Sequence, residues 1–376
     1  MTATEAAPAL DLFLELAAIP SPPGHERAVA DRVLEYLHGL GLEPSEDGAG
    51  AGIGSDIGNI YVGVPPTAGE AGMPIFLNAH LDTVPPTRPI EPEVRNGIVV
   101  NRHDGILGAD NKAAVSVMLE AVAALVREGR PHAGVELVLT PMEEVGLRGA
   151  KAFDAARLHA RVGYCYDHAA PVGGVVLAAP TQRTLRFRFI GRAAHSGIAP
   201  EQGRSAVVAA ARAIADMPLG RIDAATTANV GLVSGGVAGN IVPPECDVLA
   251  EARSRDPGGL RDQVQAMLDA ATFAANLAEC ELESRIESEY EGYRFGRGDI
   301  AVRIAARALD ACGHTPVYLE SGGGADANVW NAAGLQCVNL CNGMAEIHTG
   351  SEHIAASDLA AMLDVTLALI DAARTP

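Results

Sequence analysis

Two adjacent carboxylates, Glu143 and Glu144, come two residues after the apolar run 135–140. The run is short, rich in β-branched residues and bounded by Gly134 and Pro141, which predicts a buried strand. A strand that ends in two acids delivers both to the rim of a sheet, where open α/β folds bind ligands. Because like charges this close repel each other, something positive must lie between them, or the two acids are simply solvated loop residues.

A histidine and an acid end a second predicted strand. The first half of residues 74–82 is apolar and indicates a buried strand, whose end delivers His80 and Asp82 to the sheet edge. A carboxylate two residues after a histidine suits an imidazole that binds a metal through one nitrogen while an acid holds the other. Taken alone, this spacing is weak evidence for a metal site.

Two more acids stand at the ends of predicted elements. Asp110 precedes residues 113–126, which are almost wholly apolar and predict a buried helix; capping of the helix N-terminus is its alternative role. The strand-like run 161–168 carries Asp167 near its end. Each acid alone has an ordinary structural role open to it. Their convergence on one sheet edge favours a shared site made of His80, Asp110, Glu144 and Asp167.

Composition limits the classes of partner. The chain has 376 residues with 28 basic and 47 acidic side chains, a net charge of −19, which argues against a nucleic-acid or anionic-membrane surface. No apolar run reaches the roughly 18 residues of a membrane span, and no basic region precedes an apolar one at the N-terminus. The six cysteines form no CxxC pair, so we expect reduced thiols and a cytoplasmic protein.

The sequence pattern changes near residue 180. Residues 184–190 alternate between apolar and polar, which predicts a strand with one face in water. The elements that follow predict the order β-α-β-β-α-β of a ferredoxin-like sandwich. We therefore place an inserted α+β domain at 180–291, between the two parts of an α/β domain at 1–179 and 292–376.

Several short motifs, taken together, match a known family. In chain order they are residues 78–83 (NAHLDT), 108–113 (GADNKA), 143–146 (EEVG), 166–167 (YD) and 347–349 (IHT). They resemble the motifs of the M20 family of dinuclear zinc peptidases over essentially the whole chain, and most of all its tripeptidase T branch. The resemblance implies a zinc-exopeptidase-type catalytic domain, with a mixed central sheet flanked by helices, and an inserted lid and dimerisation domain.

The resemblance also implies two Zn²⁺ ions per chain, with Co²⁺ or Mn²⁺ as possible substitutes. The implied ligands are His80 and Asp167 for one metal, Glu144 and His348 for the other, and Asp110 for both. Glu143 would act as general base toward the water between the metals. Asp82 would orient His80 from behind. The peptide bond between Asp110 and Asn111 would be cis, as in the family.

Further residues resemble those that hold the substrate in the family. His195 would stabilise the oxyanion from the inserted domain of a dimer partner, with a structural loop histidine as the alternative. Asn240 and Arg253 would hold the peptide backbone and its terminal carboxylate, although a salt bridge is an equal alternative for Arg253. A glycine-rich loop would line the cleft from the catalytic domain through Ser321, Gly322 and Gly323.

The resemblance implies a homodimeric two-zinc exopeptidase that cleaves short peptides, and within that class a tripeptide aminopeptidase; the cysteine pattern adds the expectation that it is cytoplasmic. An M20-type dipeptidase or an N-acyl-amino-acid amidohydrolase is the nearest enzyme alternative, since the metal ligands are shared. A catalytically inactive binding protein on the same scaffold is the alternative from another class. Glu143 and every ligand position carry a competent side chain, which speaks against it.

Overall fold

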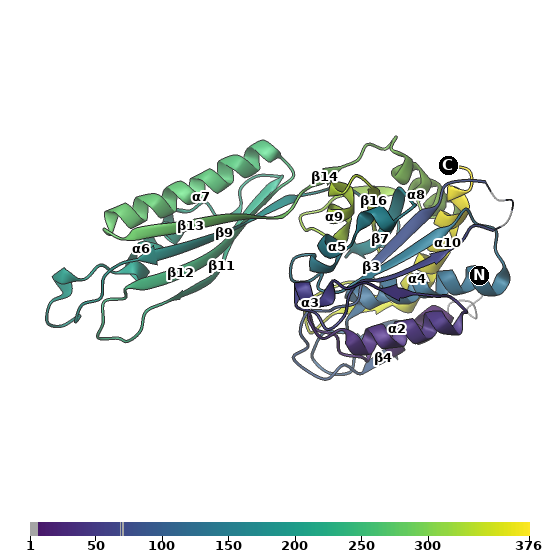
Figure 1. Cartoon of the computed structure of the whole chain (residues 1–376), viewed down its shortest axis with the longest axis horizontal. Coiled ribbons are helices and arrows are strands. Elements are labelled where there is room, and N and C mark those ends of the chain that lie inside the picture. The colour runs from purple at the N-terminus through teal and green to yellow at the C-terminus, as the bar shows by residue number, and fades with distance from the viewer. Residues whose placement is uncertain (1–6, 68, 70) are drawn as a thin grey trace. The chain divides into compact units, whose positions relative to one another are not determined.

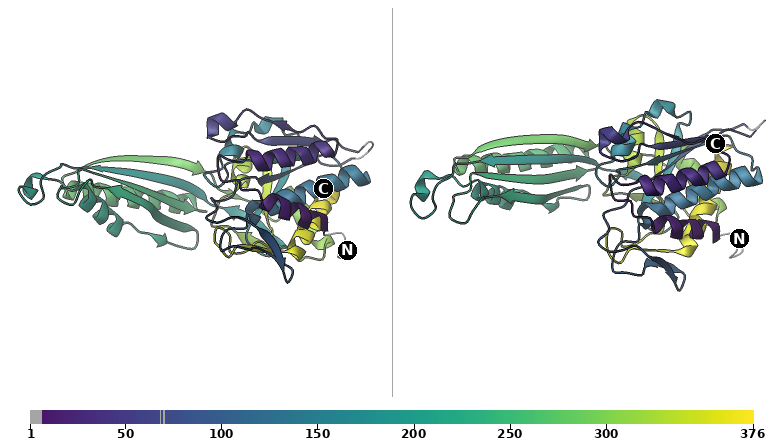
Figure 2. Two further views of the ribbon diagram at one scale, coloured as in Figure 1. Left: turned by 90° about the horizontal axis from the view of Figure 1, so that it is seen from below. Right: turned by 60° about the horizontal axis from the view of Figure 1, so that its bottom comes forward.

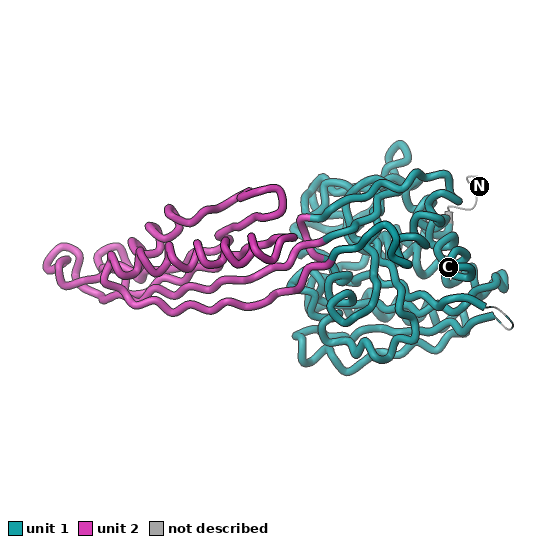
Figure 3. Tube along the Cα trace, turned by 90° about the horizontal axis from the view of Figure 1, so that it is seen from above, with its two compact units in different colours: residues 1–178, 294–321, 325–376 teal, residues 179–293, 322–324 magenta. Residues whose placement is uncertain are grey.

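The computed structural model describes residues 7–67, 69 and 71–376. The chain divides into two compact units (Figure 3): residues 1–178, 294–321 and 325–376 form unit 1, and residues 179–293 and 322–324 form unit 2. The segment 322–324, which the sequence placed with 292–376, groups with unit 2. A side chain at Gly324 would overlap the ring of Tyr290, so this close approach requires a glycine.

A nine-stranded mixed sheet forms the centre of unit 1 (Figure 1), as the sequence predicted. In spatial order its strands are β1 (Ser45–Glu46), β2 (Ile60–Val64), β6 (Val135–Thr140), β3 (Ile75–His80), β7 (Val162–His168), β16 (Gln336–Cys341), β8 (Gly174–Ala179) and β14 (Tyr293–Arg294), with β15 (Val317–Glu320) paired to β8. Four neighbours, β6, β3, β7 and β16, run parallel. Parallel strands finish at the same edge of a sheet, so the loops that follow these four start side by side.

Helices cover both faces of this sheet. They are α1 (Ala7–Ala17), α2 (Arg27–Gly39), α3 (Gly50–Ile53), α4 (Ala109–Glu128), α5 (Arg148–Ala152), α8 (Ile300–Ala311), α9 (Asp326–Ala332) and α10 (Ala356–Ala373), with a 3₁₀ turn at Ala155–Arg157. Both faces need cover because successive side chains of a strand point to opposite faces, and those of β3 are buried on both. Leu77 joins the large core that includes α4, whereas Phe76 packs edge-on against Trp330 of α9, with ring centroids 5.8 Å apart.

Helix α4 lies at the middle of the core. It contacts β3, β6 and β7, and α1 and α10 cover it, which explains why residues 113–126 are almost wholly apolar. The sequence predicted this helix from residue 113, and the assigned element begins at Ala109. Asp110 and Asn111, however, have non-helical backbone angles, so the regular helix begins after them. A small sheet of β17 (His353–Ala355), β5 (Ile98–Asn101) and β4 (Pro92–Arg95) completes unit 1.

Unit 2 has the predicted element order, with a two-residue strand added. Its elements are β9 (Thr181–Ile190), a 3₁₀ turn (Pro200–Gln202), α6 (Ala206–Asp216), β10 (Gly220–Arg221), β11 (Thr226–Gly235), β12 (Glu245–Ser254), α7 (Pro257–Leu277) and β13 (Glu281–Tyr290). The antiparallel sheet has the order β10-β11-β12-β9-β13. Both helices lie on one face of it (Figure 2), as in a ferredoxin-like sandwich.

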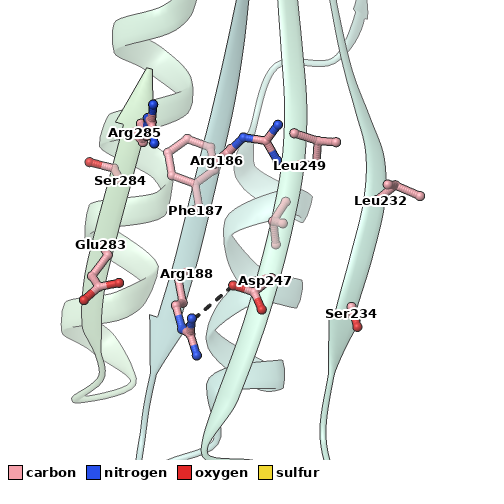
Figure 4. Close-up of a pocket in the computed structure, with 11 residues that line it drawn as sticks. Arg186, Phe187, Arg188, Leu232, Ser234, Asp247, Leu249, Glu283, Ser284 and Arg285 are labelled. Atoms are coloured by element: carbon pink, nitrogen blue, oxygen red, sulfur yellow. Dashed lines mark ion pairs between the residues drawn. The ribbon is translucent and has the colours of Figure 1, made fainter. Parts of the chain in front are cut away.

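The alternation along β9 sets the two faces of this sheet. Leu185, Phe187 and Phe189 are buried beneath the helices, and Arg186 and Arg188 point away from them. The uncovered face is a shallow hollow lined mainly by polar and charged side chains (Figure 4). In the described part of the chain, none of the helices combines the length and apolar character needed to cross a membrane.

Candidate active site

The four parallel strands of unit 1 deliver the predicted site residues to one edge. His80 is the last residue of β3, and Asp167 lies one residue before the end of β7. The turn that carries Glu143 and Glu144 follows β6, and the loop that carries His348 follows β16. His80 pairs with Thr140, the last residue of β6, so β3 and β6 end at the same level and their following loops start side by side.

Asp110 reaches this edge from the start of α4 and lies between two histidines. Nε2 of His80 is 3.1 Å from its Oδ1, and Nε2 of His348 is 3.2 Å from its Oδ2. Asp110 has an extended ψ of 101°, outside the helical range, so its backbone does not continue the helix. The Asp110–Asn111 peptide bond is cis. One carboxylate thus offers a separate oxygen to each imidazole.

Each of the two histidines also lies near a second carboxylate. Oε1 of Glu144 lies 3.1 Å from Nε2 of His348, and Oδ1 of Asp167 lies 3.9 Å from Nε2 of His80. Ligand atoms of His80, Asp110 and Glu144 all lie within 4.8 Å of one another, as do those of His80, Glu143 and Asp167. The structure therefore also brings Glu143, predicted to be unligated, within reach of the same cluster.

A tight turn holds the two adjacent glutamates. Both backbone N–H groups donate to the carboxylate of Asp82, at 2.9 Å for Glu143 and 3.1 Å for Glu144. Nδ1 of His80 lies 2.9 Å from the backbone carbonyl oxygen of Asp82 and 3.5 Å from its carboxylate. The sequence assigned Asp82 to His80. In the structure its backbone carbonyl lies closest to the imidazole, and its side chain holds the turn.

The electrostatics of the cluster show a surplus of negative charge. Burial raises the pKa of Glu143 well above its usual range, and the charge of Asp167 adds to this effect. Burial and the charge of Asp110 raise the pKa of Asp167 to about 7. Burial lowers the pKa of His80, but hydrogen bonds to carboxylates, Asp110 first, outweigh it and raise this pKa well above its usual range.

The donor set fits divalent cations. Imidazole nitrogens and carboxylate oxygens are the mixed ligands that zinc accepts, and cations would neutralise the crowded acids. The two halves differ in access to solvent: the side chain of His80 is 2% exposed and that of His348 is 45% exposed. His348 also has a left-handed backbone, with φ of 63°, a conformation that non-glycine residues adopt mainly where surrounding contacts impose it.

Other predicted site residues belong to unit 2 and are described within that unit. His195 is exposed, and its Nδ1 accepts a hydrogen bond from the backbone N–H of Gly197 at 3.2 Å. Its Nε2 therefore carries the proton of the neutral ring and can donate. The backbone carbonyl of Asn240 accepts from Ser196 at 3.0 Å.

Arg253 forms the salt bridge that was its alternative role. Its guanidinium donates two hydrogen bonds to Glu251, at 3.1 and 2.9 Å. Ser321 is buried in unit 1, where its backbone N–H donates to Ala178, and Gly322 and Gly323 belong to unit 2. A substrate role for these residues stays a prediction.

Two buried side chains that were not predicted from the sequence hold the ligand-bearing segments. Asn339 of β16 is 4% exposed, accepts from the backbone N–H of Asp167 at 2.9 Å and donates to its carbonyl at 3.0 Å. Glu352 binds the backbone around Asp110 in a similar way. Neither has a local signal, because each acts on a segment far away along the chain.

Comparisons with known proteins agree with this geometry. The model of the peptidase family M20/M25/M40 matches residues 76–372. The uncharacterized protein YqjE of Bacillus subtilis is 39% identical over 364 residues, which cover 97% of this chain and 98% of YqjE. The aminopeptidase PepT of Bacillus cereus is 38% identical with a TM-score of 0.86, and the alignment covers 98% of both chains. A tripeptidase of Staphylococcus aureus is 34% identical with a TM-score of 0.91 and 99% coverage of both chains.

Proposed function

The chain belongs to peptidase family M20/M25/M40, and from this membership we propose that it is a metal-dependent aminopeptidase acting on short peptides, above all tripeptides. Two whole-length structural relatives, at 38% and 34% identity, are an aminopeptidase PepT and a tripeptidase. The observation that carries the proposal is the placement of Asp110, whose two oxygens each face a different histidine.

In this proposal the chain holds two divalent cations, Zn²⁺ by preference and Co²⁺ or Mn²⁺ as substitutes. His80 and Asp167 would hold one cation, Glu144 and His348 the other, and Asp110 would contribute an oxygen to each. The pairing is supported by the distances of 3.9 Å between His80 and Asp167 and 3.1 Å between His348 and Glu144. When bound, such a pair of cations polarises the scissile carbonyl and acidifies a water molecule.

The chain's own proton carrier in this scheme is Glu143. Burial and the neighbouring acids raise its pKa, which suits a carboxylate that must accept a proton and release it again. Glu143 takes the proton from the attacking water and passes it to the leaving amine as the peptide bond breaks. The hydrogen bond from its backbone N–H to Asp82 keeps it on the turn beside the ligands.

Unit 2 supplies the remaining groups of the proposal, as a lid and as the surface through which two chains pair. His195, whose Nδ1 accepts from Gly197, has its Nε2–H free to donate to the oxyanion of the reacting carbonyl in the partner's site. Asn240 and the segment Ser321–Gly323 would contact the peptide. Arg253, which donates to Glu251 through Nε and Nη2, would bind a terminal carboxylate through its remaining N–H groups.

Turnover of a matched pair of tripeptides tests the substrate class. The purified, metal-loaded protein is assayed with one tripeptide and with its N-acetylated form. An aminopeptidase needs the free α-amino group, so we expect cleavage of the first only. Cleavage of the blocked peptide as well or better favours an N-acyl-amino-acid amidohydrolase, and preference for dipeptides favours a dipeptidase. Fewer than two bound metals per chain and no turnover would favour a binding protein.

Mixed dimers test the role of His195. His195→Ala and Glu143→Gln are each expected to be inactive, with metal content unchanged. If His195 acts in the partner's site, mixing and re-equilibrating the two variants restores activity, because one site in each hybrid then has both groups. His38→Ala, an exposed histidine of unit 1, is the control and keeps full activity. Hybrids that stay inactive while both variants are dimeric contradict the exchange.

A further inference from the structure

Glu352 is a buried carboxylate to which the proposed chemistry assigns no role. Only 3% of the surface of Glu352 is exposed. Its Oε2 accepts the backbone N–H groups of Leu107 at 2.7 Å and Gly108 at 2.9 Å, and its Oε1 accepts that of Asp110 at 3.0 Å. Both oxygens are therefore used to bind one short stretch of backbone, which lies more than 200 residues away along the chain.

This stretch needs an outside acceptor. The first N–H groups of a helix have no partner within the helix, and the residue before it usually provides a side-chain oxygen. Here the residue before α4 is Gly108, which has no side chain, and its φ of 79° suits glycine. Glu352 binds two N–H groups just before α4 and that of Asp110 at its start, and so determines where the backbone of Asp110 lies.

Glu352 also belongs to the loop that carries His348. The two residues are four positions apart, and the loop between them is braced by bonds of its own: Thr349 donates to the carbonyl of Glu346 at 2.6 Å, and the backbone N–H of Ser351 donates to Thr349 at 3.1 Å. The loop thus touches Asp110 twice, at its backbone through Glu352 and at its carboxylate through His348. Two contacts of this kind fix the distance between the two segments.

A buried lysine supports the same layer. Lys112 is fully buried, donates to the backbone carbonyl of Ile19, and interacts electrostatically with both Glu352 and Asp82. Asp82 holds the turn of Glu143 and Glu144 by the same means, a carboxylate that accepts backbone N–H groups. Each of the two carboxylates beneath the cluster therefore secures a different ligand-bearing segment.

We propose that Glu352 is a positioning residue that sets the spacing between Asp110 and His348, and through it the separation of the two cations. This inference rests on the proposed two-cation site. Side chains that hold metal ligands in place typically change metal affinity by about 10- to 100-fold when they are replaced. The amide of glutamine has one acceptor oxygen, and its NH₂ group would face N–H donors, so Glu352→Gln must lose at least one of the three hydrogen bonds.

The test uses Mn²⁺ alone, added to the purified full-length chain. Calorimetry gives the affinity of each equivalent, and electron paramagnetic resonance reports the magnetic coupling between the two ions, which depends on their separation. We expect Glu352→Gln to bind the second equivalent about 10- to 100-fold more weakly, with altered coupling. Glu346→Gln, an exposed glutamate of the same loop, is the matched control and behaves as wild type.

Other outcomes separate the possible failures. If Glu352→Gln lowers the melting temperature but leaves Mn²⁺ affinity and coupling unchanged, Glu352 has only a structural role, and the inference is overturned. If Glu352→Gln does not fold, Glu352→Asp carries the test, because it keeps the charge on a shorter side chain; unchanged coupling in that variant also overturns it. Binding of a single Mn²⁺ by the wild-type chain removes the two-cation site itself.

Discussion

Nε2 of His348 lies 3.2 Å from Oδ2 of Asp110, the oxygen that does not face His80. A carboxylate used in this way differs from a helix cap, which would aim its oxygens at the first N–H groups of α4. The N–H of Asp110 itself is instead bound by Glu352, together with the N–H groups of Leu107 and Gly108 that precede the helix. Because a remote residue binds this backbone, both oxygens of Asp110 remain available for the two histidines.

Replacement of Asp110 by asparagine tests this shared carboxylate. The introduced amide has a single acceptor oxygen, so it can serve one half of the site only. We expect Asp110→Asn to bind at most one metal tightly, measured by elemental analysis after dialysis. Loss of several kcal/mol of charge stabilisation corresponds to a rate lower by about a thousandfold or more. Asp11→Asn, an exposed aspartate of α1, is the control, and a variant with two tight metals and normal turnover contradicts the bridging role.

The sequence predicts the parts of this molecule whose causes are local. Runs such as 135–140 identify buried strands, and the alternation in 184–190 identifies the half-exposed strand β9, because side-chain periodicity depends only on neighbouring residues. A strand that ends in His80 or before Glu143 places those side chains at the sheet edge once the strands are parallel. Residue type and position therefore suffice to nominate the cluster.

Contacts between distant segments cannot be predicted from local pattern in this way. Nothing near Glu352 in the sequence says that it will bind the backbone at Asp110, and nothing near Asn339 says that it will hold the backbone of Asp167. The carboxylate of Asp82 lies 3.5 Å from Nδ1 of His80, the residue it was predicted to orient, but nothing in the sequence indicates that it also accepts from the N–H groups of the following turn. Such partners are determined by tertiary packing, which local pattern does not encode.

Glu143→Gln separates proton transfer from metal binding. The glutamine keeps the size of the side chain and the backbone hydrogen bond to Asp82, but it cannot accept a proton from water. General-base catalysis contributes about two to four orders of magnitude, so we expect kcat to fall by that amount while two metals remain bound. Elemental analysis and tripeptide turnover measure the two effects. Glu43→Gln, an exposed glutamate, should change neither; a large loss of metal in Glu143→Gln would mean that Glu143 is a ligand.

Metal binding should depend on pH through His348. Hydrogen bonds to Asp110 and Glu144 raise the pKa of this histidine to about 10 before a cation binds. The ring then holds a proton at neutral pH, and a metal must displace it to reach the neutral imidazole. Affinity therefore rises with pH and is lost as pH falls, by about tenfold per pH unit for each proton displaced. Calorimetry with Mn²⁺ from about pH 6 to 8, in buffers of different ionisation enthalpy, counts the protons. An affinity that does not vary with pH contradicts this picture, and His38→Ala serves as the control.

Gly163→Ala tests the packing that supports the strand ends. Gly163 of β7 pairs with Phe76 of β3, and a methyl group at this position would overlap the Phe76 ring. The ring has little room to move, because it packs edge-on against Trp330, which itself contacts Phe153 at a centroid distance of 5.6 Å. Overpacking of this kind costs about 1–3 kcal/mol of unfolding free energy, seen as a lower urea midpoint. Gly39→Ala is the matched control, since nothing lies within 4 Å of a methyl group there, and alanine is favoured over glycine in a helix by up to about 1 kcal/mol. Equal midpoints for the two variants would show that β7 and β3 can separate without cost.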